Sequence, residues 1–343
     1  MYKFGIWRYD DLANSRTILG KTRQYSYALL KTPVPATPAD LARFETVIRN
    51  VRLSSGIWRT TYRSRFDDLD AVAQRVLERT FSEDRTVDLH DLGASDGLLS
   101  IDWAERVHAT FPQSRMTASD VILYFTEAVW SSGETYILEP SSRPIQYTRP
   151  PFVVSIDVPE RVVYPLNQLA RAWGRRRLED LRLCSAEVRW NGVPDEQVIT
   201  RGGWTFQQIP LVHPAVLSYA RNGRFRVMPA DAFSPLPSKY DVVRVMNLYQ
   251  PTVFPPGKIH ESLRAILGNI TEGGILIAGR TIEGEGQRND ASIFQKSRGR
   301  VRVLDKLSKG FEFEHFVTTY QYDTAAMPEQ ISPAVFPVRE VRC

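Results

Sequence analysis

The sequence has little of what builds disulfide-stabilised domains or metal centres. Only two cysteines occur among the 343 residues, Cys184 and Cys343, and they lack the paired spacing of a zinc site. They argue against a disulfide scaffold and fit a reducing compartment. The five histidines are not paired at the helical spacing typical of metal ligands. We therefore expect no metal centre.

Long apolar runs are missing as well. No uninterrupted apolar stretch reaches the roughly 18 residues of a membrane-spanning helix. The opening residues, MYKFGIWRYDDLANSR, lack the apolar core of a signal peptide, so we expect a cytoplasmic protein. What is present, 43% hydrophobic and 24% charged residues, is ordinary for a globular protein with a substantial core. The net charge of +5 is a mild basic excess, which an Arg-rich surface explains without any particular partner.

The hydrophobic pattern predicts three parts. Residues 1–85 carry two runs with apolar residues three and four positions apart, PADLARFETVIRNVRL and SRFDDLDAVAQRVLERTF, which predict a helical segment. Residues 86–124 and 221–343 alternate β-rich runs with helical ones and end in ASIFQKSRGRVRVLDKL, a predicted antiparallel hairpin. This alternation predicts an α/β core with a mostly parallel sheet and helices on both faces. Residues 125–220 break the alternation and predict an inserted lid or substrate subdomain, because an ordinary crossover is far shorter.

Within the insertion, two local patterns stand out. ETYILEP and RPIQYTR flank two serines and predict a hairpin. The stretch PERVVYPLNQLARAWGRRRLEDLRL has helical periodicity, with Pro165 marking either a kink or the first turn.

The first strand–turn–helix of the core is residues 88–97, DLHDLGASDG, followed by LLSIDWAERVHATF. Such a turn offers free backbone N–H groups and the positive end of a helix to a ligand. The dinucleotide fingerprint G-x-G-x-x-G does not fit, because after Gly93 the second and third glycines are replaced by Ser95 and Leu98. A nicotinamide-dependent oxidoreductase is therefore disfavoured.

The same turn matches another pattern at every position: an acidic residue at the strand end, then apolar-Gly-x-(Gly/Ser)-x-Gly, from Asp91 to Gly97. This resembles motif I of the class I S-adenosylmethionine-dependent methyltransferases. The resemblance covers about residues 86–124 and 221–282. It implies a Rossmann-like fold, S-adenosyl-L-methionine as cofactor and transfer of its methyl group. A Gly-rich turn that merely packs remains the structural alternative.

Three further strand ends follow in the order of that family. The resemblance implies that Asp120 accepts hydrogen bonds from both ribose hydroxyls, and that Asp231 binds the adenine amino group while its apolar neighbours cover the ring. It places Asn247 at the methionine end. Each Asp has a structural alternative as a turn former or helix cap. The implied cofactor-binding residues are Asp91, Gly93, Ala94, Ser95, Gly97, Asp120, Val121, Asp231, Ala232, Phe233 and Asn247.

No residue stands out as the catalytic base. Tyr249 lies in Asn-Leu-Tyr-Gln, which resembles the Asn-Pro-Pro-Tyr of nucleic-acid amino methyltransferases, but both prolines are missing. His213, in IPLVHPAV, is a second weak candidate for a general base. A non-catalytic cofactor-binding or interaction module on the same fold is therefore the alternative to an enzyme.

The sequence also leaves open which molecule the protein binds or methylates. Residues 162–182 form a basic, Trp-bearing helical stretch, which suits an anionic membrane surface or phosphates, or packs as an ordinary solvated helix. A small-molecule or lipid acceptor is favoured, with nucleic acid as a further option. The sequence identifies neither the acceptor nor the oligomeric state, and it leaves open whether Cys343 is the natural C-terminus.

Overall fold

A computed structural model of the chain describes residues 5–6, 24–33, 35–59, 61–149, 152–157, 165–190, 196–283 and 287–321. The chain forms two compact units, each built from separate stretches of sequence. Unit 1 comprises residues 1–67 and 91–230, and unit 2 comprises residues 68–90 and 231–343. The residues predicted as an insertion, 125–220, all fall in unit 1.

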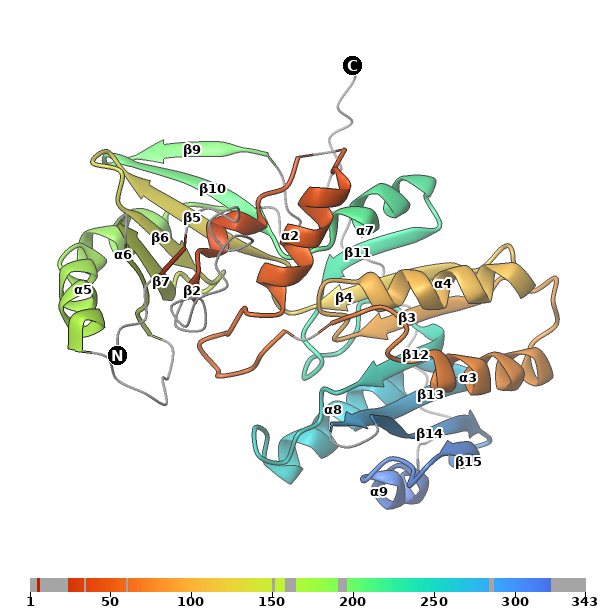
Figure 1. Ribbon diagram of the computed structural model, residues 1–343. Helices are drawn as coiled ribbons and strands as arrows, with labels where there is room; N and C mark the ends of the chain where they lie inside the picture. Colours follow the sequence, from red (N-terminus) through yellow and green to blue (C-terminus); the bar gives the residue numbers. More distant parts are fainter. Residues whose placement is uncertain are drawn as a thin grey trace. The chain divides into compact units, whose positions relative to one another are not determined.

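A six-stranded antiparallel sheet makes up much of unit 1 (Figure 1). Its strand order is β8-β7-β6-β5-β10-β9. The strands are β5 (Tyr124–Trp130), β6 (Thr135–Leu138), β7 (Pro144–Arg149), β8 (Phe152–Ser155), β9 (Val198–Arg201) and β10 (Trp204–Pro210). The predicted hairpin is confirmed, because β6 and β7 pair antiparallel.

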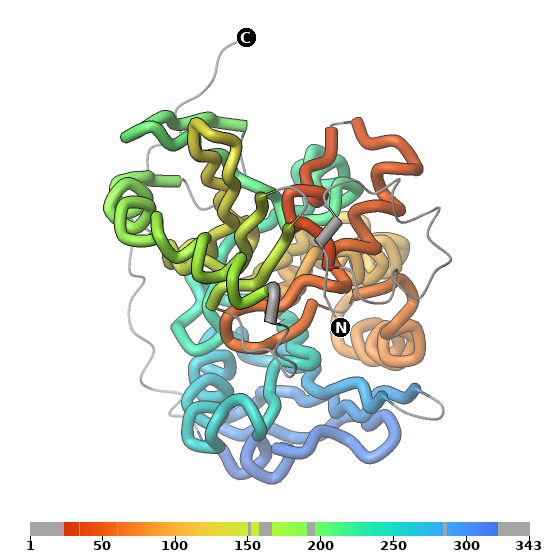
Figure 2. The backbone as a smooth tube through the Cα atoms, turned by 60° about the vertical axis from the view of Figure 1, so that its left-hand side comes forward, coloured from red at the N-terminus to blue at the C-terminus, as the bar shows by residue number. Residues whose placement is uncertain are grey.

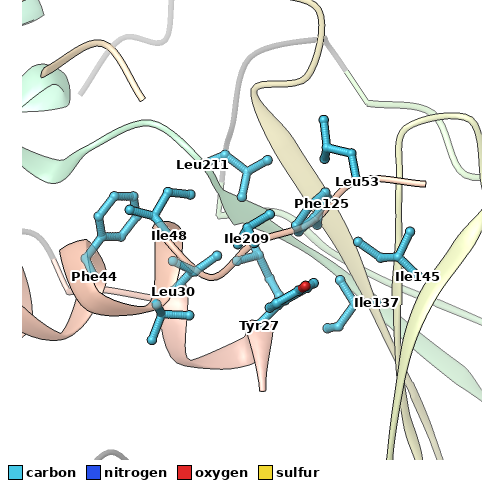
Figure 3. Packing of buried hydrophobic residues seen from close by; sticks show 12 residues of the cluster. Tyr27, Leu30, Phe44, Ile48, Leu53, Phe125, Ile137, Ile145, Ile209 and Leu211 are labelled. Carbon is cyan, nitrogen blue, oxygen red and sulfur yellow. The ribbon is translucent and has the colours of Figure 1, made fainter. Parts of the chain in front are cut away.

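Both faces of this sheet are covered. On one face, α2 (Pro38–Ile48) and the 3₁₀ turn η2 (Tyr27–Leu30) pack through Phe44, Ile48 and Tyr27 against Phe125 and Ile209 of the strands (Figure 3). On the other face lie α5 (Pro165–Arg175) and α6 (Leu178–Ala186), as Figures 1 and 2 both show. Since successive strand residues point to opposite faces, strands buried on both sides need few polar positions.

The helices begin where local chemistry favours it. In α2, the Thr37 side chain accepts a hydrogen bond from the Asp40 N–H while the Asp40 carboxylate accepts one from the Thr37 N–H. This is a capping box, with Pro38 at the first helical position. Pro165 likewise opens the predicted basic helix, which is interrupted after Arg175 and continues as α6.

The second sheet has seven strands in the order β11-β4-β3-β12-β13-β14-β15. They are β3 (Asp88–Leu92), β4 (Arg115–Asp120), β11 (Phe225–Pro229), β12 (Tyr240–Met246), β13 (Ile270–Ile282), β14 (Arg288–Ser297) and β15 (Arg300–Leu307). β11 runs parallel to β4, and β12 runs parallel to β13. β14 and β15 form the predicted antiparallel hairpin. The chain is thus an α/β protein, as the alternation predicted.

The remaining elements are a small two-stranded sheet, several helices and a 3₁₀ turn. In unit 1 these are β1 (Gly5–Ile6) and β2 (Gln24–Tyr25), which pair parallel, α4 (Leu98–Thr110), α7 (Pro214–Tyr219) and the 3₁₀ turn η3 (Ala220–Asn222). In unit 2 they are α3 (Asp67–Thr80, from its second residue onward), α8 (Pro256–Asn269) and α9 (Glu314–Thr319). Both amphipathic runs of residues 1–85 are helices, α2 and α3, as predicted.

Candidate functional site

The turn between β3 and α4 has the backbone of a tight ligand loop. Gly93, Ser95 and Gly97 all have positive φ, 77°, 58° and 80°. At Gly97 an added Cβ would lie 3.2 Å from the methyl groups of Val216, so both the conformation and the space favour glycine there. The N–H groups of Gly93 and Ala94 both donate to the carbonyl of Ser119, at 2.9 and 2.8 Å. The loop is therefore fastened to the end of β4.

Asp91, at the end of β3, is buried and accepts a hydrogen bond from the Ser100 hydroxyl at 2.6 Å. Ser100 lies in the first turn of α4. This bond ties the strand end to the helix that the loop introduces, so the loop is held at both of its ends.

The loop and Asp120 come together. The Ser95 N–H donates to Oδ2 of Asp120 at 2.9 Å, although the two residues are 25 positions apart. The Ile122 N–H donates to Oδ1 of the same carboxylate at 3.1 Å. Val121, between them, is 59% exposed. The predicted first and second strand ends of the site therefore meet in unit 1, as the carboxyl ends of neighbouring parallel strands do.

Arg59 belongs to this group, and sequence reasoning missed it. Its Nη2 donates to Oδ1 of Asp120 at 2.8 Å and also to the carbonyl of Ile122, while Nη1 donates to the carbonyl of Ser95 at 3.3 Å. The side chain is only 4% exposed. No sequence signal could have found it, because Arg59 is one of several arginines in a stretch without periodicity, 61 positions before Asp120.

Asp96, the acidic residue inside the loop, is buried and accepts a hydrogen bond from the Leu98 N–H at 3.1 Å. Burial raises the pKa of this carboxyl from its ordinary value of 3.8 to about 6, and the hydrogen bond from the Leu98 N–H and the nearby Arg59 partly offset the rise. Asp96 therefore titrates near pH 6 in the folded protein.

His213 also lies at this loop in unit 1. The main-chain N–H of His213 donates to the Asp96 carbonyl at 2.9 Å. Its ring Nδ1 accepts from the Ala215 N–H at 3.2 Å, and this hydrogen bond caps the start of α7. Its Nε2 is 3.6 Å from Oε1 of Glu45, and its ring meets Phe44 edge-on. Burial lowers the pKa of His213, so the ring is neutral at physiological pH. The geometry gives this histidine a structural task beside the loop.

In unit 2, the third predicted strand end is a local turn. Asp231 is exposed, and its Oδ1 accepts from the Phe233 N–H at 2.9 Å. Ala232 is buried, and the Phe233 ring lies 4.7 Å from that of Phe254. Asp231 acts here as a turn former, with its carboxylate still open to solvent.

The end of β12 is a second feature of unit 2. Asn247 has a positive φ of 59°, and its Oδ1 accepts from the Thr281 N–H at 2.6 Å while its Nδ2 donates to the Thr281 hydroxyl at 3.3 Å. Tyr249 is buried, with its hydroxyl 2.7 Å from that of Ser262. Burial raises the pKa of Tyr249 well above its usual value, so its hydroxyl stays protonated.

The basic helix α5 exposes apolar side chains to solvent and buries one of its arginines. Arg171 of α5 is buried and donates to the Ser155 carbonyl at 2.7 Å, whereas Leu169 is 67% and Trp173 45% exposed. The guanidinium of Arg149 lies 4.5 Å from the Trp173 ring centre. Residues 162–164 of the predicted helix and Cys343 lie outside the described residues.

Within the described part of the chain, no cluster of three or more His, Cys, Asp or Glu side chains is arranged to hold a metal ion. None of its helices is both long and apolar enough to cross a membrane.

No protein-family model matches this chain, and no curated protein sequence matches it. Solved structures do. An O-methyltransferase family protein from Burkholderia thailandensis is 10% identical, with a TM-score of 0.29 over 72% of this chain and 42% of that one. Human N-acetylserotonin methyltransferase in complex with SAM is 10% identical, with a TM-score of 0.27 over 72% and 40% of the two chains. The cyclase SpnF is 17% identical, with a TM-score of 0.26 over 63% and 46%.

The match thus spans less than half of each of these neighbours. Two of them are named as methyltransferases and one as a cyclase, so the likeness does not select a reaction. Because the TM-scores stay below 0.3, the function proposed next rests on the residues of this chain.

Proposed function

We propose that this protein is an S-adenosyl-L-methionine-dependent methyltransferase of the class I, Rossmann-like kind. The observation that carries the proposal is the hydrogen bond from the Ser95 N–H to the Asp120 carboxylate. It brings a small-residue loop at a helix start together with an acidic side chain at the next strand end. The loop N–H groups of Gly93, Ala94 and Ser95 are used within the chain, so the expected free donors are not available there, and the Asp120 carboxylate beside the loop is the group that suits a nucleoside hydroxyl.

The residues of unit 1 have distinct tasks in this proposal. Gly93 and Gly97 give the loop its positive φ angles, and Gly97 leaves room for the side chain of Val216 beside the loop. Asp120 accepts a ribose hydroxyl, and its neighbours hold the carboxylate in a fixed direction. The bound cofactor would supply an activated methyl group on a sulfonium. Transfer then depends on alignment of an acceptor and on exclusion of water more than on a strong base.

The remaining predicted cofactor residues, Asp231, Ala232, Phe233 and Asn247, stay predictions. The Asp231 carboxylate is exposed and has capacity for a further donor beyond its turn bonds. Asn247 instead uses both ends of its side-chain amide on Thr281. An interaction with the cofactor through the Asn247 main chain agrees better with this geometry than one through its side chain.

A ligand-binding module without catalysis is the second candidate. The observation that favours it is that both candidate bases are buried and hydrogen-bonded: Tyr249 to Ser262, and His213 to the start of α7. For the enzyme, a small-molecule or lipid acceptor remains the favoured class.

The test is ligand binding by the purified chain. We expect S-adenosylhomocysteine to raise the melting temperature, and Asp120→Ala to abolish the rise. Asp102→Ala is the matched control. Asp102 also pairs with an arginine, Arg63, at 2.9 Å, but it lies outside the loop. No shift at millimolar ligand in the wild-type protein would remove the proposal. Transfer of a labelled methyl group from the cofactor into any fraction of a cell extract would separate the enzyme from the module.

A further inference from the structure

Arg59 joins three separate pieces of the candidate site. Its guanidinium donates to the carbonyl of Ser95 in the loop, to the carboxylate of Asp120 at the end of β4, and to the carbonyl of Ile122 just beyond. An arginine side chain suits such a task, because its donors are fixed in one plane and never lose their charge. With 4% exposure, the side chain is part of the interior.

The main chain at Arg59 is anchored in the interior of unit 1. The Arg59 N–H donates to the carbonyl of Val51 at 3.2 Å, and Val51 is fully buried in the apolar cluster of this unit. A side chain held in this way acts as a fixed part of the site rather than as a loose flap.

These contacts use most of the acceptor capacity of Asp120. A carboxylate offers about four lone-pair sites, two on each oxygen. Oδ1 accepts from both Arg59 and the Ile122 N–H, which fills it. Among the residues that the structure describes, only the Ser95 N–H donates to Oδ2. One position remains, on Oδ2, and the side chain of Asp120 is 15% exposed.

We propose that Arg59 is a positioning residue that fixes Asp120 so that it accepts a single ribose hydroxyl, instead of the two that the family resemblance implies. The proposal rests on the proposed function, because it specifies how the cofactor nucleoside is recognised. It makes the site selective for one of the two hydroxyls. It also makes Arg59 necessary for tight binding, since the guanidinium holds the loop and the carboxylate in one arrangement.

The first experiment uses the unaltered chain with S-adenosylhomocysteine and its 2′-deoxy and 3′-deoxy analogues in isothermal titration calorimetry. Loss of the hydroxyl that Asp120 accepts should weaken binding about 10- to 100-fold, the range for a hydrogen bond to a charged group. Loss of the other hydroxyl should change affinity less than about threefold. Equal losses with both analogues, or no loss with either, would overturn the single-hydroxyl arrangement.

The second experiment compares Arg59→Met, Arg59→Lys and Arg63→Met. Arg59→Met keeps most of the side-chain volume but no donor, and we expect about 10- to 100-fold weaker binding of S-adenosylhomocysteine. Arg59→Lys keeps the charge and should recover at least part of that loss. Arg63→Met removes an arginine–carboxylate pair of the same segment and should bind as the wild type does. Unchanged binding by Arg59→Met would show that Arg59 is not needed for recognition, and tighter binding would show that it competes with the ligand; either result contradicts the proposal.

The outcomes separate the two proposals. If the wild-type chain binds no S-adenosylhomocysteine, the proposed function fails. If it binds but the analogues or Arg59→Met behave otherwise than expected, only the role of Arg59 fails. Should Arg59→Met not fold, the analogue experiment on the wild-type chain still decides.

Discussion

Arg244 and Asp70 form a fully buried ion pair in unit 2. Nη1 of Arg244 lies 2.8 Å from Oδ1 of Asp70, and the side chains are 0% and 4% exposed. Arg244 is in the middle of β12, a strand whose residues are all buried, and Asp70 is on α3. Two charges in such a place are tolerated only together, because each loses its hydration.

Removing one partner should therefore be costly. We expect Arg244→Met to lower the free energy of unfolding by about 3–5 kcal/mol, because the carboxylate of Asp70 is then buried without its counter-charge. Urea denaturation measures this. The double variant with Asp70→Leu should recover much of the loss. Arg85→Met is the control, since Arg85 pairs with Asp241 but is 44% exposed, and such pairs contribute about 0–1 kcal/mol. Equal losses in the single and double variants would show that the charge of Asp70 is not the cause.

Stability should depend on pH through Asp96. Its folded-state pKa of about 6 lies above its ordinary value of 3.8 because of burial. The stability that the neutral carboxyl contributes is fully present below about pH 4 and is lost as the pH rises through 6. Asp96→Asn, which keeps an acceptor for the Leu98 N–H, should therefore stabilise the protein at pH 8 by up to about 3 kcal/mol.

The difference in stability between Asp96→Asn and the wild-type protein should vanish near pH 4. Melting temperatures of both proteins across pH 4–8 measure it, with Asp102→Asn as a control on a carboxylate that is paired and only 19% exposed but outside the loop. A constant difference at every pH would contradict the titration of Asp96.

The end of β12 depends on the side chain of Asn247. Asn247→Ala removes the acceptor for the Thr281 N–H and leaves a side chain at a φ of 59°. We expect it to lower the free energy of unfolding by about 1–3 kcal/mol. Asn247→Asp keeps the acceptor, and Asn247→Gly relieves the backbone. The expected order of thermal stability is wild type, then Asp, then Gly, then Ala. If Gly and Ala were equally stable, the positive φ would have no measurable cost.

Tyr249 should not act as a base. Burial raises the pKa of its hydroxyl, which therefore stays protonated throughout the neutral range. We expect Tyr249→Phe to leave the rate of methyl transfer within about threefold of the wild type, because no proton-transfer step is lost. Its cost should appear in stability, about 1 kcal/mol for the lost hydrogen bond with Ser262. Single-turnover transfer of labelled methyl, compared with the melting temperature, separates the two effects. A 100-fold loss of rate without a loss of stability would assign catalysis to Tyr249.

Much of the architecture was predictable because it depends on neighbours in sequence. The three- and four-residue spacing of apolar side chains predicted α2 and α3, and the β-rich runs predicted β3, β4, β12 and β13. By contrast, β5, β9 and β10 were not predicted. β5 and β10 pair across 74 to 86 positions, from Trp130 with Trp204 to Tyr124 with Pro210, which no local pattern encodes. β9 and β10 pair across the two-residue turn Gly202–Gly203, a local hairpin signal that was missed.

The candidate site divides in the same way. The sequence by itself determined the loop from Gly93 to Gly97 and its place at a helix start, because small residues and turn-forming side chains act over a few positions. Only the tertiary structure decided which donors bind the carboxylate of Asp120. Arg59 reaches it from 61 positions away, through packing of Val51 in a core that no local pattern encodes. Partners of a carboxylate depend on where the whole chain places its donors, and that is a property of the folded protein.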